Sequence, residues 1–235
     1  MSASAGSVAR KFRRLLDTPG AQLRLMVLST GGHHCIGVDL ESGALVRAWS
    51  FGAVDQRISP YDLVDVTVGG GPDLVPDPTE PDALVISSPP SYAGQLTGRR
   101  ATRLMRPLLH PEKVPLLGFH GPSVPFWERR PDHPSVSLAQ PQGAITVTAD
   151  PEGPGSGTMW CHFAWGRRPQ VLACADPRLA AWMERTGRDH ATVHEGTYLV
   201  VALEPPIAGQ CHKVVESLVP RRRPQGWGKM RRTRA

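Results

Sequence analysis

Apolar and polar side chains alternate in short runs along most of the chain, a period of two that is typical of half-buried β-strands. The clearest case is residues 35–49, CIGVDLESGALVRAW, where two alternating runs meet at a bend over residues 41–43. This pattern predicts a β-hairpin. In its second arm Leu45, Arg47 and Trp49 share one face, which predicts a ligand surface made of a basic and an aromatic side chain.

Similar runs recur on both sides of a proline-rich middle. Glycine and proline, 24 of each, are scattered between the runs without a repeat period, which favours many short strands over long helices. Further strands are predicted at residues 23–29, 61–68, 82–87, 143–148, 159–165, 170–173, 197–203 and 211–218. About five strands fall in the first 90 residues, the number that a small barrel uses.

Two short helices are predicted. Asp176 can cap a helix that has Pro177 at its first position, continues over residues 178–186 and stops at Gly187. Earlier, residues 99–106 have arginines at the spacing of one helical face, which indicates either a solvated face or a phosphate-binding ridge.

The sequence therefore predicts a mainly β protein built from two small barrels in tandem, with a few short helices. We divide it into a basic flexible leader, a first barrel, an arginine- and proline-rich connection, a second barrel and a basic disordered tail. The respective ranges are 1–21, 22–90, 91–134, 135–219 and 220–235.

The net charge of +6 is concentrated at the two ends of the chain. Residues 220–235 hold seven basic and no acidic side chains, residues 1–17 carry +3, and residues 18–219 are left with −4. Arginine-rich tails suit phosphate contacts and nucleic acid, although a solubilising tail has the same composition. No apolar run is long enough to span a membrane and the leader lacks an apolar signal segment, so we expect a cytoplasmic protein.

No catalytic constellation is present in the sequence, and we expect neither an enzyme nor a bound cofactor. The pairs His34-Cys35, Cys161-His162 and Cys211-His212 contain zinc-ligand types, but neighbours on a strand point to opposite faces. Buried thiols are the simpler interpretation of the four cysteines.

Several stretches, in this order and spacing, resemble the dual OB-containing domain family of prokaryotic proteins. They are LMVLS with CIGVDLESGALVRAW, PYDLVDV, MWCHFAWGRRPQVLACADPRL and TYLVVALEPPIAGQCHKVVESLV. The resemblance spans most of residues 23–219 and implies two OB-like barrels, without bringing catalytic residues. Barrels of this kind bind single strands through a strand face and its flanking loops.

The sequence thus predicts a non-catalytic protein that binds nucleic acid, with single strands favoured. The alternative is a module that recognises a protein or a small ligand and carries a solubilising tail. Aromatic side chains beside cations on strands are the combination that stacks bases and follows a phosphate backbone. The candidate binding residues are Arg47, Trp49, Trp165, Arg167, Arg168, Lys213, Arg221, Arg222, Arg223, Arg231 and Arg232.

Overall fold

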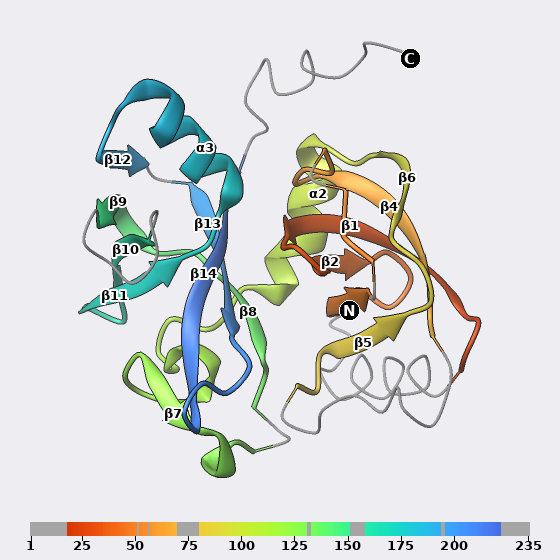
Figure 1. Cartoon of the computed structure of the whole chain (residues 1–235), viewed down its shortest axis with the longest axis horizontal. Coiled ribbons are helices and arrows are strands. Elements are labelled where there is room, and N and C mark those ends of the chain that lie inside the picture. The colour runs from red at the N-terminus through yellow and green to blue at the C-terminus, as the bar shows by residue number, and fades with distance from the viewer. Residues whose placement is uncertain are drawn as a thin grey trace.

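The computed structural model describes residues 18–50, 52–55, 57–69, 80–130, 133–150, 158–193 and 196–221. In this part of the chain, two β-sheets lie side by side with a short helix between them (Figure 1). The prediction of a mainly β protein is confirmed.

The first sheet has six strands and is built from the N-terminal part of the chain. Its order is β5 (Ala83–Ile86), β3 (Leu45–Ser50), β2 (His34–Asp39), β1 (Gln22–Thr30), β4 (Asp62–Thr67) and β6 (Ser91–Gln95). The predicted hairpin is β2–β3, with Gly43 at a φ of +72° and the Asp39 carboxylate accepting from the Ser42 amide at the bend.

The second sheet has eight strands. Seven run in the order β12 (His190–Val193), β9 (Gln142–Asp150), β10 (Thr158–Trp165), β11 (Arg168–Cys174), β14 (Gln210–Pro220), β13 (Thr197–Leu203) and β8 (Val136–Ala139). The eighth, β7 (Ser123–Pro125), pairs with the start of β14. The pairing of β11 with β14 is parallel, so two segments distant in sequence meet in the middle of this sheet.

Neither sheet is a closed barrel. At one end of the first sheet, the bridge between Val68 and Ile86 brings the chain after β4 against the end of β5. The structure therefore contains two sheets, of six and eight strands, that do not close fully, where the sequence predicted two small barrels.

The segment expected to be a connection between the barrels contributes to both sheets. It supplies β6, β7 and helix α2 (Gly98–Met105), and it places Leu116 and Leu117 in the core of the second sheet. Its 3-10 helices span Arg106–Leu108, Leu116–Gly118 and Phe126–Glu128.

Three apolar cores hold the molecule together. The first sheet and the second sheet each enclose one, and a third, which we call the interface core, lies between them. Strand β13 is buried on both faces because Leu199 points into the second core while Val200 points into the interface core. Apolar burial is the dominant stabilising term in folding, so the interface core joins the two sheets firmly.

Helix α3 (Pro177–Thr186) has the predicted ends. Asp176, 2% exposed, accepts hydrogen bonds from the amides of Arg178 and Leu179, and Gly187 ends the helix at a φ of +62°. Asp176 also accepts from the Leu218 amide, which fixes α3 against β14. Among the described helices, none has the length and apolar character needed to cross a membrane.

Candidate ligand-binding site

A cavity of about 510 Å³ opens beside the turn between β10 and β11, and we call it the hairpin pocket. Its walls come from the loop after α2, from the β10–β11 turn and from the start of β14. It is lined by Glu112, Lys113, Val114, Pro115, Leu116, Phe119, His120, Gly121, Gln142, Trp165, Gly166, Arg167, Arg168, Gln170 and Lys213. Four of the predicted binding residues thus meet in one place: Trp165, Arg167, Arg168 and Lys213.

The β10–β11 turn presents two arginines at the rim of the pocket. Trp165 pairs with Arg168, which leaves a two-residue loop of Gly166 and Arg167 with φ angles of +56° and +65°. Positive φ at both positions is the type I′ geometry that matches the twist of hairpin strands. The side chains of Arg167 and Arg168 are exposed there.

One wall of the pocket is apolar and aromatic. Trp165 is 6% exposed, and its indole N–H donates to the Val114 carbonyl at 3.0 Å. Phe119 and Leu116 continue this wall. The indole hydrogen bond fixes the loop after α2 against β10, so the wall is held in place before any ligand arrives.

Lys213 brings an amine to the floor of the pocket. The residue is 3% exposed, its Nζ donates to the Phe119 carbonyl at 2.7 Å, and it lies 3.9 Å from the centroid of the Phe119 ring. Burial lowers the pKa of Lys213 to about 8. No carboxylate of the described residues forms an ion pair with it.

His110 supports the loop that forms this wall. Its Nε2 donates to the Pro115 carbonyl at 2.9 Å, so its Nδ1 can accept from the Ser137 hydroxyl at 3.3 Å. Burial lowers the pKa of His110, with a smaller contribution from the nearby charge of Lys213. The neutral ring therefore ties the loop to β8 without adding charge.

Positive charge prevails in the hairpin pocket. Lys113, Arg167, Arg168 and Lys213 line it, against the single carboxylate of Glu112. The Gln142 amide donates to that carboxylate at 2.8 Å. A concave site with this charge and an aromatic wall suits an anionic ligand that carries a planar group.

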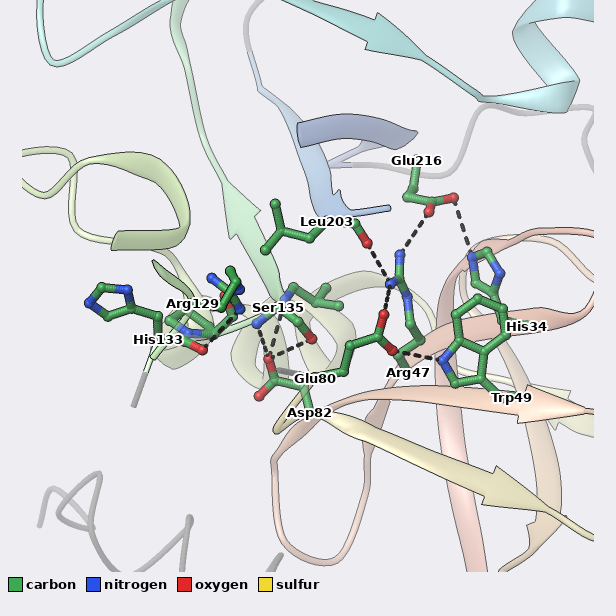
Figure 2. A network of polar contacts seen from close by, with 12 residues as sticks. His34, Arg47, Trp49, Glu80, Asp82, Arg129, His133, Ser135, Leu203 and Glu216 are labelled. Carbon is green, nitrogen blue, oxygen red and sulfur yellow. Dashed lines mark hydrogen bonds and ion pairs between the residues drawn. The ribbon is translucent and has the colours of Figure 1, made fainter. Parts of the chain in front are cut away.

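The structure corrects the assignment of Arg47. Arg47 is 1% exposed and lies between the two sheets (Figure 2). Its guanidinium donates to the Leu203 carbonyl at 2.7 Å and to Glu216 at 2.9 Å, with Glu80 at 3.5 Å. The second sheet covers the hairpin face that carries it, so Arg47 is not available to a ligand in this structure.

Trp49 belongs to the same network rather than to an open surface. Its indole N–H donates to Glu80 at 3.0 Å, and its ring lies 4.7 Å from that of His34 (Figure 2). His34 in turn contacts Glu216 at 3.3 Å. Burial alone would raise the pKa of Glu216, but His34 and Arg47 together hold it below its usual value.

A second polar contact ties the sheets at the same boundary. The half-buried Asp82 carboxylate, just before β5, accepts from the amides of Ser135 and Val136 at 2.7 and 3.2 Å (Figure 2). Burial raises the pKa of Asp82 despite these hydrogen bonds. The polar residues at this boundary thus have structural partners on both sheets.

The remaining predicted residues lie at the C-terminal end. Arg221 is exposed after β14, while Arg222, Arg223, Arg231 and Arg232 fall outside the described residues. All four cysteines are buried, as the sequence indicated. Within the described ranges, no group of three side chains is placed to hold a metal ion.

Sequence reasoning missed the side of the pocket that comes from the proline-rich middle. Lys113, Phe119 and His120 lie in a segment without hydrophobic periodicity, where pattern analysis has no signal. The neighbouring charges Glu112 and Lys113 gave no hint of a pocket, since such pairs are usual on a solvated surface.

No family model matches the sequence, and no curated protein matches it. Among solved structures, the chain matches a crystal structure described as the tetrameric p202 HIN2, at 8% identity and a TM-score of 0.31. The match covers 86% of this chain and 94% of that chain. A TM-score this low carries no inference about fold or ligand.

Proposed function

We propose that this protein binds single-stranded nucleic acid and that the hairpin pocket holds one nucleotide of the strand. The observation that carries the proposal is the convergence of Trp165, Arg167, Arg168 and Lys213 on one cavity. Strand binding without strong sequence preference combines cations for the backbone with aromatic surfaces for the bases.

The dimensions and chemistry of the pocket support a nucleotide. Its volume of about 510 Å³ lies within the usual range for small-ligand sites. Guanidinium groups at the rim pair bidentately with phosphate oxygens, which suits Arg167 and Arg168 to the backbone. The aromatic wall of Trp165 and Phe119 then supplies apolar contact for the base.

We further propose that the two sheets are OB-like units, as the resemblance to the dual OB-containing domain family implies. Their separate apolar cores support this proposal. The basic C-terminal tail would add sequence-independent attraction for phosphates. The two contributions are separable by experiment.

The first test removes the rim charges without disturbing the turn. The double variant Arg167→Gly, Arg168→Ala keeps a residue that tolerates the positive φ of +65° at position 167. We expect its affinity for a fluorescein-labelled single-stranded oligonucleotide to fall about tenfold at low salt, because two phosphate contacts are lost. The slope of log K against log[salt], measured by anisotropy, should shrink by about 1.4 for two contacts on a single strand.

The control is the double variant Arg99→Ala, Arg103→Ala, which removes the same charge from the exposed face of α2. Its affinity should stay within about twofold of the parent protein, since these arginines lie away from the pocket. Equal losses in the two double variants would contradict a specific role for the hairpin pocket and indicate general charge attraction.

Truncation after Arg221 separates the tail from the pocket, because β14 ends at Pro220 and stays complete. We expect weaker binding with a smaller salt slope, and a residual affinity that still responds to the Arg167→Gly, Arg168→Ala change. If the truncated chain binds no oligonucleotide at low salt, the tail alone accounts for binding and the pocket proposal fails.

A second candidate function is recognition of a free phosphorylated small molecule, which the pocket volume of about 510 Å³ favours. A thermal shift with thymidine monophosphate, in the absence of any oligonucleotide effect, would favour it over strand binding.

A further inference from the structure

The cations of the hairpin pocket lie at two depths. Arg167, Arg168 and Lys113 are exposed at the rim, whereas Lys213 is 3% exposed at the floor. A phosphate that touches only the rim cations can be part of a continuous strand. A phosphate that reaches Lys213 must enter the pocket.

An internal phosphodiester is poorly suited to the floor because the strand continues on both sides of it. Lys213 is 3% exposed and lies below the exposed rim cations of a pocket of about 510 Å³, so both flanking nucleotides would have to descend to the floor and return past the rim. A phosphate at the end of a strand has a neighbour on one side only, so it can reach the floor while the rest of the strand leaves past the rim.

We propose that Lys213 anchors the terminal phosphate of a nucleic-acid strand, so that the hairpin pocket selects phosphorylated strand ends. This inference rests on the proposed strand binding and adds a preferred substrate to it.

The chemistry of the two groups favours a terminal phosphate at this position. A phosphate monoester carries about −1.5 to −2 charges at neutral pH and three strong acceptor oxygens. Lys213 has three N–H donors, of which the Phe119 carbonyl accepts one at 2.7 Å. The monoester would give this buried ammonium the anionic partner that buried charges normally require.

Rigid surroundings hold Lys213 in place for this contact. Its backbone N–H donates to the Pro122 carbonyl at 2.8 Å, and its ammonium lies against the Phe119 ring. The position of Nζ is thus set by β14 on one side and by the loop after α2 on the other, so little ordering is needed when the phosphate binds.

The test compares three thymidine dodecamers that carry a 5′-phosphate, a 3′-phosphate or no terminal phosphate. We expect one phosphorylated end to bind about tenfold more tightly than the unphosphorylated strand. In Lys213→Met this preference should fall to within about twofold, whatever affinity the unphosphorylated strand retains. Lys213→Gln repeats the test with a polar side chain, and thermal melting verifies that both variants fold.

Lys113→Met is the matched comparison, because it removes a lysine from the rim. It should weaken all three strands alike and leave their ratio unchanged. A ratio lost in Lys113→Met and kept in Lys213→Met would overturn the assignment to Lys213.

The remaining outcomes separate this inference from the proposed function. Equal binding of the three strands by the parent protein would overturn selection of strand ends and leave strand binding intact. No binding of any strand would refute the proposed function itself. Competition by inorganic phosphate or thymidine monophosphate at concentrations as low as those of the dodecamer would assign the site to a free phosphate and overturn strand-end selection.

Discussion

Replacing Arg47 with alanine is expected to lower the free energy of unfolding by about 3–5 kcal/mol, the usual cost of removing one partner from a buried ion pair. The variant leaves Glu216, 7% exposed, without the guanidinium that compensates its charge, and it leaves the Leu203 carbonyl without its donor. Chemical denaturation followed by tryptophan fluorescence measures the change. The loss should appear as a shift of the unfolding midpoint, because Arg47 of the first sheet bonds Leu203 and Glu216 of the second.

Two comparisons test whether burial of the Arg47 ion pair causes this loss of stability. Arg24→Ala breaks the ion pair with Asp65 in which the Arg24 side chain is 54% exposed, and it should lower the free energy of unfolding far less than Arg47→Ala does, because solvent screens the pair. The double variant Arg47→Met, Glu216→Leu should recover much of the loss, since apolar side chains can replace a buried pair. A loss in Arg47→Ala no larger than in Arg24→Ala would show that the buried network contributes little to stability.

Replacing Lys213 with methionine is expected to stabilise the protein, in contrast to Arg47→Ala, and to raise the free energy of unfolding at pH 7. Folding lowers the pKa of Lys213 from 10.5 to about 8, so keeping the ammonium charged in the folded protein costs free energy. We expect a gain of about 2 kcal/mol, less than the full shift implies, because the pocket opens to solvent and the Phe119 contacts are lost. A residue that costs stability and lines a pocket is typical of a functional site.

The pH dependence provides the check on this interpretation. Below about pH 8 the lysine is protonated in both states, so the cost is complete and constant. Between about pH 8 and 10.5 the unfolded chain binds more protons than the folded protein. The free energy of unfolding of the parent protein therefore rises relative to that of the variant. Urea denaturation of both proteins at pH 7 and pH 9.5 should therefore show a smaller difference at the higher pH. A difference that stays constant would mean that packing, and not charge, separates them.

Local patterns in the sequence were sufficient to predict the secondary structure that depends on neighbours in the chain. The alternation in residues 35–49 predicted β2–β3, and the sequence from Asp176 to Gly187 predicted α3 with both ends. The sequence did not predict strands β6, β7, β8 and β12, because they are short or lack apolar alternation. They form by pairing with strands from elsewhere in the chain.

The site was harder to predict, for a reason that Arg47 and Arg168 illustrate. Arg47 lies two residues before Trp49 on one strand, and Arg168 pairs with Trp165 across a hairpin. Alternation shows which residues of a strand share a face, but not whether that face is covered. The face that carries Arg47 is covered by the second sheet, while Arg168 remains exposed at the pocket. Which face is covered depends on the packing of one sheet on another, and the floor of the pocket depends on the parallel pairing of β11 with β14.

Strand β14 takes part in both the pocket and the boundary between the sheets. Lys213 points to the hairpin pocket, and three residues later Glu216 holds Arg47 of the first sheet. The first sheet contributes no lining residue to the pocket in the described part of the chain. A change that removes Arg47 would alter the contacts of the same strand that carries Lys213, so selection on the proposed pocket would extend to the first sheet. Substitutions in the two halves of this chain should therefore evolve together.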